Sequence, residues 1–221
     1  RLFATPSIAI AECKSKTSEM ARRAGAAVMK SIGLMTEFND NTFEEVFVEE
    51  NELDIYEDKL GTALVKLSGT DISDKDSKQI SILLNTIGDF ERIGDHAINI
   101  CGYSNRLKER NIQFSETAQK EIQEMKEICD SLMGHLLNPE VDALESYGVI
   151  ASMEQKIDDM TKQHRENMLQ RISKGTCTDE GSILYSEMLT DFERIGDHAL
   201  NISNQMSLRI VAVQENLMQE K

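Results

Sequence analysis

Apolar residues recur every three or four positions along most of the chain, which is the spacing of one buried face of an α-helix. One row consists of Ile80, Leu83, Ile87, Phe90, Gly94, Ala97 and Cys101, and another of Tyr185, Leu189, Phe192, Gly196, Ala199, Ser203 and Met206. Steps of three and four residues alternate in both rows, as in the seam of helices packed side by side. We find no convincing alternation of apolar and polar residues, the pattern of a half-buried strand. The pattern therefore predicts an all-α protein.

Capping residues mark two long helices at the start of the chain. Thr5, followed by a proline, predicts the start of a first helix that runs toward Phe38. Thr42 and Glu45 have the spacing of a capping box, so we expect a second helix to be capped by Thr42. It is expected to end near Gly69, with that glycine in a left-handed C-terminal conformation.

Similar signals predict four further helices. A third helix is expected over 73–110, and Ser115 is the expected N-cap of a fourth. Pro139 predicts the start of a fifth helix, which ends at 174–176. The sixth helix is expected to begin after Thr178 and to continue nearly to the end of the chain.

The chain contains an internal repeat. The nine residues Asp-Phe-Glu-Arg-Ile-Gly-Asp-His-Ala occupy 89–97 and return at 191–199, on the third and the sixth predicted helix. The second and fifth helices can be aligned in the same way, and the short connections indicate antiparallel neighbours. We therefore predict two tandem three-helix bundles, made of six long antiparallel helices, with 1–112 as the first unit and 113–221 as the second.

Four pairs of acidic residues share the form Glu-x-x-x-Asp. Residues at i and i+4 lie on one face of a helix, where two like charges repel each other. The pairs fall at equivalent places in the two units, and those on the third and sixth helices flank the apolar seam. They are Glu50 and Asp54, Glu91 and Asp95, Glu154 and Asp158, and Glu193 and Asp197. Two pairs brought together in a half-buried place must take up protons or be neutralised by cations.

Carboxylate oxygens favour hard or borderline cations such as Mg²⁺, Mn²⁺, Ca²⁺ or iron. A carboxylate can also bridge two ions, which lie about 3.5–4 Å apart in shared sites. We therefore predict one multinuclear metal site in each unit, held by the eight acids of the four pairs. An acidic, solvated helix face with lysine and arginine neighbours is the alternative.

Other residues of the nine-residue motif have simpler expected roles. Gly94 and Gly196 lie inside long helices and on the seam, so we expect close approach of a neighbouring helix there. Arg92 and Arg194 have aspartates three residues before and after them, which predicts local ion pairs; contact with an oxyanion near the metals is the alternative.

The motif histidines are poor candidates for metal ligands. Carboxylate-bridged metal sites in helical bundles use Glu-x-x-His, whereas the third residue after Glu91 is Gly94. We therefore expect His96 and His198 to be hydrogen-bonded packing residues.

Composition excludes several classes of protein. There are 39 acidic and 24 basic residues, for a net charge of −15, and no basic run that would suit a nucleic acid. No apolar stretch is long enough to span a membrane. The four cysteines lack metal-ligand spacing, and Cys101 and Cys129 fall at apolar helical positions, which predicts buried, reduced thiols. The chain opens without methionine, so we expect a piece of a longer protein.

The repeated segments Asp-Phe-Glu-Arg-Ile-Gly-Asp-His-Ala-Ile-Asn-Ile and Asp-Phe-Glu-Arg-Ile-Gly-Asp-His-Ala-Leu-Asn-Ile resemble the signature of the PhoU family, and so do the Glu-x-x-x-Asp pairs on the second and fifth helices. The resemblance covers nearly the whole chain. It implies two three-helix bundles whose acids hold clusters of iron or zinc, with manganese, magnesium, nickel or calcium as alternatives. It assigns these ligands to Glu50, Asp54, Glu91, Asp95, Glu154, Asp158, Glu193 and Asp197.

The resemblance also implies a regulatory role in phosphate uptake and signalling, through binding and without catalysis. The opening residues 1–12 are similar to the segment that follows the membrane part of bacterial sodium/phosphate cotransporter-like proteins. The implied partners are a membrane phosphate transporter or the chain's own upstream membrane domain, a signalling kinase, and a second copy in a homodimer. The implied location is the cytoplasm, at the inner face of the membrane. A metal-dependent phosphate-ester hydrolase and a metal-free acidic scaffold are the competing hypotheses.

Overall fold

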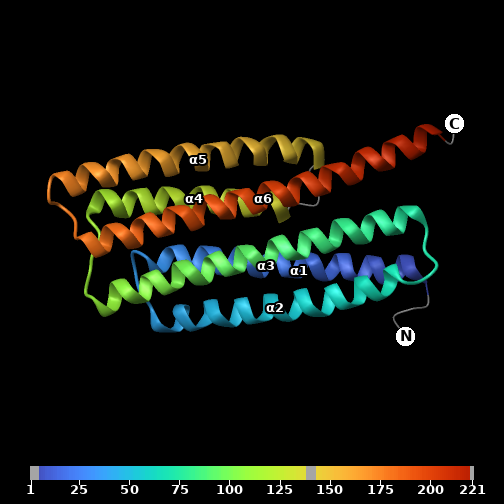
Figure 1. The fold of residues 1–221 in the computed structure, drawn as a ribbon, viewed down its shortest axis with the longest axis horizontal. Helices are drawn as coiled ribbons and strands as arrows, with labels where there is room; N and C mark the ends of the chain where they lie inside the picture. Colours follow the sequence, from blue (N-terminus) through green and yellow to red (C-terminus); the bar gives the residue numbers. More distant parts are fainter. Residues whose placement is uncertain (1–4, 138–142, 220–221) are drawn as a thin grey trace.

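The computed structural model describes residues 5–137 and 143–219, and this part of the chain folds into six helices without strands (Figure 1). The prediction of an all-α fold is confirmed. The helices are α1 (Pro6–Leu34), α2 (Asp40–Ser68), α3 (Asp74–Glu109), α4 (Glu116–Leu137), α5 (Ala143–Ser173) and α6 (Asp179–Gln219).

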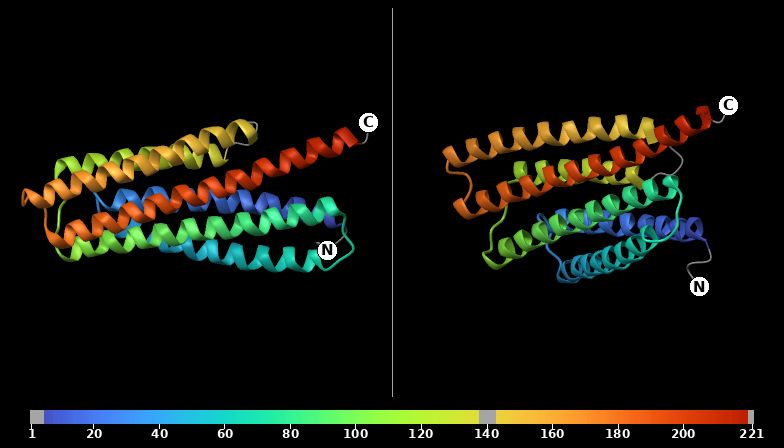
Figure 2. Two further views of the ribbon diagram at one scale, coloured as in Figure 1. Left: turned by 45° about the horizontal axis from the view of Figure 1, so that its top comes forward. Right: turned by 45° about the vertical axis from the view of Figure 1, so that its right-hand side comes forward.

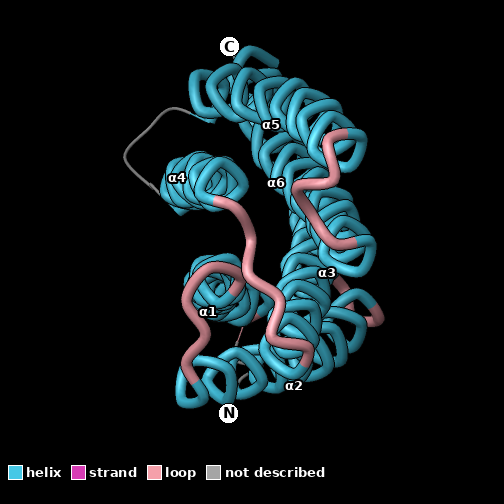
Figure 3. The backbone as a smooth tube through the Cα atoms, turned by 90° about the vertical axis from the view of Figure 1, so that its left-hand side faces the viewer, coloured by secondary structure: helices cyan, strands magenta, loops and turns pink. Residues whose placement is uncertain are grey.

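Four helices lie side by side in a curved layer, in the order α2, α3, α6 and α5, and α1 and α4 lie on one side of that layer (Figure 3). Helix α1 packs against α2 and α3, and α4 packs against α5 and α6, so each half of the chain forms a three-helix bundle. Helices α3 and α6 run antiparallel through the middle and join the two bundles, as two further views show (Figure 2).

The predicted seams form the core. All seven seam residues of α3 are buried, and so are the first six of α6. The seventh residue, Met206, is 43% exposed, so its predicted burial is wrong.

The predicted N-cap Ser115 is confirmed, and Ser73 and Thr178, near which the third and sixth helices were expected to begin, also cap their helices. The backbone N–H groups of Asp76, Ala118 and Gly181 donate to the side-chain oxygens of Ser73, Ser115 and Thr178. Pro6 occupies the first turn of α1 as expected, although Thr5 makes no side-chain cap bond. Pro139 lies outside the described residues.

Two predictions near α2 are wrong. The N-cap is Asn39, whose Oδ1 accepts from the backbone N–H of Thr42, because the helix begins at Asp40. Gly69 has φ −82°, so it does not adopt the left-handed conformation, and the last carbonyls of α2 are satisfied by ordinary turn bonds.

The first helix ends at Leu34 and is therefore shorter than predicted. Phe38 lies in the following turn, and its ring packs against that of Phe43 at 5.5 Å between centroids. The turn therefore directs Phe38 onto α2, where it covers the small cluster of Leu34 and Val46.

No helix in the described ranges contains a stretch that is both long enough and apolar enough to cross a lipid bilayer. The cysteine prediction is confirmed: Cys101 and Cys129 are buried free thiols. Burial raises the pKa of Cys101 to about 12, so this thiol is inert as a nucleophile.

Candidate functional site

The structure brings the four acids of the first repeat together between α2 and α3. We call Glu50, Asp54, Glu91 and Asp95 the first acid cluster. Glu50 and Glu91 are half-buried, whereas the two aspartates are exposed. Burial raises the pKa of Glu50, and the charges of Asp54 and Asp95 raise it further. The acids from the two helices therefore act on one another, as the sequence predicts.

Glu91 is the most perturbed acid of this cluster. Its pKa is raised to about 7, first by burial and then by the charge of Asp95 and a hydrogen bond with it. Asp54 and Glu57 on α2 raise the pKa further. Half of the Glu91 side chains would thus carry a proton near neutral pH, unless a cation supplies compensating charge.

The second repeat contains an equivalent group between α5 and α6. We call Glu154, Asp158, Glu193 and Asp197 the second acid cluster. Burial and the charges of the other three acids raise the pKa of Glu154. Burial, Asp197 and Asp159 raise the pKa of Asp158, whose buried Oδ1 has no hydrogen-bond partner.

The two clusters differ at one flanking position. Glu57 lies seven residues after Glu50 and adds charge near Glu91, whereas the residue seven after Glu154 is Thr161. Thr161 is 2% exposed, and its hydroxyl has no hydrogen-bond partner. The second repeat therefore lacks the flanking acid that Glu57 provides in the first, and it has a second buried oxygen without a partner.

Basic side chains of α1 pair with acids of α2 that lie outside the first acid cluster. Arg23 and Lys30 of α1 pair with Glu49 at 3.1 and 3.4 Å, and Lys30 also pairs with Glu45. Within the described ranges, the one acid of the two clusters with a basic partner is Asp197, which lies 3.3 Å from Arg194.

The acid clusters are not closed coordination shells. Within residues 5–137 and 143–219, no three or more His, Cys, Asp or Glu side chains are placed so that they could ligate one ion. The acids approach from neighbouring helices, and binding would require their flexible side chains to turn inward. The prediction of a multinuclear site in each repeat stays a prediction.

The motif glycines allow close helix packing beside the clusters. A Cβ atom on Gly94 would lie 2.5 Å from Cδ1 of Leu53, so α2 approaches α3 closely there. The same atom on Gly196 would lie 3.4 Å from Cδ1 of Ile157. The expectation of close approach is confirmed, and the contact is tighter in the first repeat.

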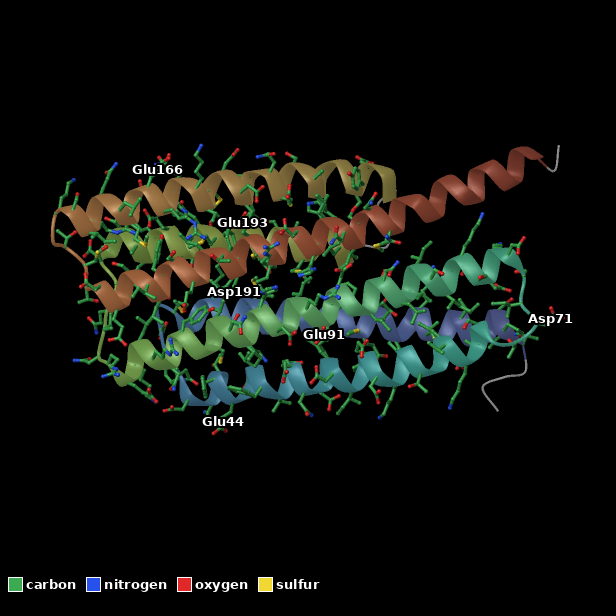
Figure 4. The ribbon with its side chains drawn as sticks, viewed as in Figure 1. Glu44, Asp71, Glu91, Glu166, Asp191 and Glu193 are labelled. Atoms are coloured by element: carbon green, nitrogen blue, oxygen red, sulfur yellow. The ribbon has the colours of Figure 1, made fainter. Side chains whose placement is uncertain are left out.

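A buried aspartate, Asp191, joins the two repeats where α3 meets α6 (Figure 4). Asp191 of α6 is 5% exposed, and its partners all lie on α3. Its Oδ1 lies 2.6 Å from Nδ1 of His96 and accepts a bond from Nδ2 of Asn99 at 3.0 Å. Its Oδ2 accepts from Oη of Tyr103 at 2.7 Å. Burial and this bond to Asp191 raise the pKa of Tyr103, which keeps the phenol protonated.

The same contact occurs in reverse. Oδ1 of the buried Asp89 of α3 lies 2.9 Å from Nδ1 of His198 on α6 and 3.8 Å from a guanidinium nitrogen of Arg92. The rings of His96 and His198 stack on each other at 5.5 Å between centroids. We call Asp89, His96, Asp191 and His198, with Asn99 and Tyr103, the central polar cluster.

The comparison with protein families agrees with this arrangement. The family model described as "PhoU domain" matches residues 17–103 and 122–206, one stretch in each half of the chain. The chain belongs to the PhoU family.

Individual PhoU proteins are similar in sequence or in fold. The chain is 29% identical over 140 residues to the phosphate-specific transport system accessory protein PhoU homolog 1 of Thermotoga maritima, a match that covers 60% of this chain and 56% of that protein. The chain therefore spans a little over half the length of this curated relative.

Solved PhoU structures share the fold over nearly their full length. PhoU from Pseudomonas aeruginosa superposes with a TM-score of 0.83 at 18% identity, covering 91% of this chain and 96% of that one. The phosphate transport system regulatory protein PhoU from Streptococcus pneumoniae gives 0.82 at 16% identity, covering 94% and 98%.

The geometry explains why this PhoU chain carries the same nine residues twice. On α3, Glu91 and Asp95 face α2, whereas Asp89, two residues or about 200° away, faces α6. Each copy of the motif thus supplies acids to its own repeat and a hydrogen-bonded Asp and His to the other. Antiparallel helices related by a two-fold axis need the same residues on both sides of their contact.

The roles predicted for the motif histidines and arginines are confirmed. His96 and His198 are hydrogen-bonded packing residues, and both arginines make local ion pairs. The prediction did not include the contact between the repeats. The available signal was that both copies of the motif carry an aspartate, Asp89 or Asp191, on the side of the helix away from the acid cluster. A residue repeated on that side indicates a second contact.

A buried carboxylate within the second repeat was also missed. Glu121 of α4 is 5% exposed and accepts hydrogen bonds from Asn167, Arg171 and Tyr185. Although burial opposes this, the bonds from Arg171, Tyr185 and Asn167 lower the pKa of Glu121, so it is charged. This network lies wholly within the second repeat. The available signal was Tyr185 at the start of the α6 seam, because the equivalent residue of the α3 seam is the apolar Leu83.

Proposed function

We propose that this PhoU-family chain is a metal-binding regulatory domain that acts in phosphate transport. The family match, the accessory protein of a phosphate-specific transport system in Thermotoga maritima and the regulatory protein in Streptococcus pneumoniae support the transport role. The observation that carries the metal proposal is the convergence of acids from neighbouring helices in both repeats, where they raise one another's pKa.

The residues fit cations of the hard or borderline class. Asp158 offers a buried Oδ1 without a hydrogen-bond partner, an arrangement that costs free energy unless the oxygen is paired. The ligands would be the eight acids of the two clusters, and carboxylate oxygens suit manganese, iron, magnesium, calcium and, with other donors, zinc or nickel. Bound ions would neutralise the half-buried acids and hold α2 against α3 and α5 against α6.

The proposed setting is the cytoplasmic face of a membrane, next to a phosphate transporter. The partner would be that transporter or a membrane domain encoded upstream in the same protein, as the resemblance of residues 1–12 to cotransporter-like proteins suggests. Contact with a signalling kinase and a homodimer belong to the same proposal. In this proposal the acids bind metal ions, and the chain does not catalyse a reaction.

Removal of one acid pair tests the proposal. In protein saturated with metal, Glu91→Ala with Asp95→Ala should abolish binding in the first repeat, whereas the second repeat should still bind metal. The reason is that the two clusters share no side chain. Metal content is measured by elemental analysis of the variant, of a variant carrying Glu154→Ala and Asp158→Ala, and of the parent.

A matched control removes the same charge from the same bundle. Glu44→Ala with Asp58→Ala deletes two exposed acids of α2 outside the cluster, and this variant should retain the parent's metal content. Failure of both repeats to bind at saturating metal after removal of Glu91 and Asp95 would contradict the division into two sites. Unchanged metal content would place the ions elsewhere.

A further inference from the structure

The central polar cluster lies on the same turns of α3 and α6 as the acids of the two acid clusters. Asp191 is two residues before Glu193, and His96 directly follows Asp95. The bond from His96 to Asp191 therefore connects a helix turn that carries acids of the first repeat to one that carries acids of the second. The reciprocal bond from His198 to Asp89 makes the same connection in the other direction.

Building on the proposed metal function, we propose that Asp89 and Asp191 are positioning residues that couple the two acid clusters. Cations between α2 and α3 would fix the rotation and position of α3. The central polar cluster would transmit that constraint to α6, and so to Glu193 and Asp197. Filling one cluster then favours filling of the other, and coupling of this kind is reciprocal.

The contacts at Asp191 are suited to such a role. The carboxylate is 5% exposed and has hydrogen-bond partners at three residues of α3, spread over two helical turns from His96 to Tyr103. A sliding or rotation of α3 against α6 would break several of these bonds at once. A buried carboxylate left without its donors is costly, so the contact favours one register of the two helices.

The two sides of the contact are unequal. Asp191 receives Tyr103 in addition to its histidine, whereas the residue of α6 that corresponds to Tyr103 is Gln205. Asp89 has Arg92 at 3.8 Å instead. The bonds to Asp191 are therefore the stronger half of the connection, and Asp191 is the residue at which to break it.

The chain provides a matched control for Asp191. Glu121 is also 5% exposed and also accepts from three residues, but all of them lie in the second repeat. Asp191→Asn and Glu121→Gln each remove one negative charge from a buried network without changing its size. Only the first of these networks joins the repeats.

Hydrogen exchange of the full chain tests the coupling. The background variant carries Glu154→Ala and Asp158→Ala, so that Mn²⁺ binds to the first acid cluster alone. We expect Mn²⁺ to slow amide exchange in α3 and also over residues 191–203 of α6, by about fivefold or more. Adding Asp191→Asn should retain the effect in α3 and abolish it in α6, whereas adding Glu121→Gln should leave both effects in place.

Tyr103→Phe is a milder second variant if Asp191→Asn does not fold, and it should reduce the effect of Mn²⁺ on α6 in part. A purely structural role for Asp191 would lower stability but leave the effect of Mn²⁺ on α6 intact, and that result would overturn the inference. Protection confined to the first repeat in the background variant would overturn it as well, with the metal proposal unaffected. Failure of the background variant to bind Mn²⁺ would overturn the first metal site and the coupling together.

Discussion

At the scale of single residues, the buried polar side chains distinguish the second repeat from the first. His164 of α5 is 5% exposed, and neither ring nitrogen has a hydrogen-bond partner. Nδ1 lies 3.8 Å from Oε1 of Glu121, and Nε2 lies 4.0 Å from Oε2 of Glu124. The equivalent residue of the first repeat, ten positions after Glu50, is the buried Leu60.

This histidine should make the protein less stable in acid. Burial lowers the pKa of His164, the charges of Glu121 and Glu124 oppose that shift, and Arg171 adds to it. Because the folded state has the lower pKa, the unfolded state binds more protons once the pH falls below about 6.5. The contribution of neutral His164 is complete above that pH and is lost as the pH decreases.

Replacement of His164 by the leucine of the first repeat tests this point. His164→Leu should stabilise the protein by about 1–3 kcal/mol at pH 8, because two unpaired buried nitrogens are removed. It should also flatten the decrease in stability between pH 7 and pH 5. Urea unfolding at several pH values measures both effects, and the reverse change Leu60→His should steepen the decrease. An unchanged pH profile for His164→Leu would show that His164 is not the group responsible.

The partners of individual buried polar side chains were the feature that the sequence predicted least well. Glu121 looks like an ordinary surface acid of an amphipathic helix, and only the packing of α4 against α5 and α6 shows that Arg171 and Tyr185 surround it. The pairing of His96 with Asp191 depends on how α3 meets α6. Helical periodicity gives the faces of a helix but not the partner that each face meets.

At the scale of helices, the close approach of α2 to α3 and of α5 to α6 positions the acids. Apolar spacing predicted all six helices, because burial of one face dominates their formation. The acid clusters could be predicted because Glu-x-x-x-Asp fixes both acids on one face. The end of α1 and the cap of α2 could not, because several polar residues between Phe38 and Thr42 are comparable as caps.

The glycines of the two motif copies should respond differently to a methyl group. Alanine is favoured over glycine in a helix by about 1 kcal/mol, and Gly196→Ala fits beside Ile157, so it should raise stability by up to that amount. Gly94→Ala pushes against the fully buried Leu53, and overpacking costs about 1–3 kcal/mol, so it should lower stability. Thermal and urea unfolding of the two variants measure the difference. Equal effects at both positions would contradict the tighter contact in the first repeat.

At the scale of the whole molecule, two bundles meet through α3 and α6 and also through α1 and α4, and the Asp–His contact between α3 and α6 occurs twice, once in each direction. The acids face the neighbouring helix within each bundle, and the Asp–His bonds face the other bundle. The nine-residue motif therefore places the proposed metal sites and the joint between the repeats on the same two helices. This arrangement would allow metal binding to change the position of the two halves of a PhoU-family chain relative to each other.

Anomalous diffraction from crystals of protein purified without chelator tests the central claim most directly. Data collected at the absorption edge of the metal found by elemental analysis should show peaks among Glu50, Asp54, Glu91 and Asp95, and among Glu154, Asp158, Glu193 and Asp197. A well-ordered map in which these carboxylates contact only water, with no anomalous peak at either cluster, would contradict the account.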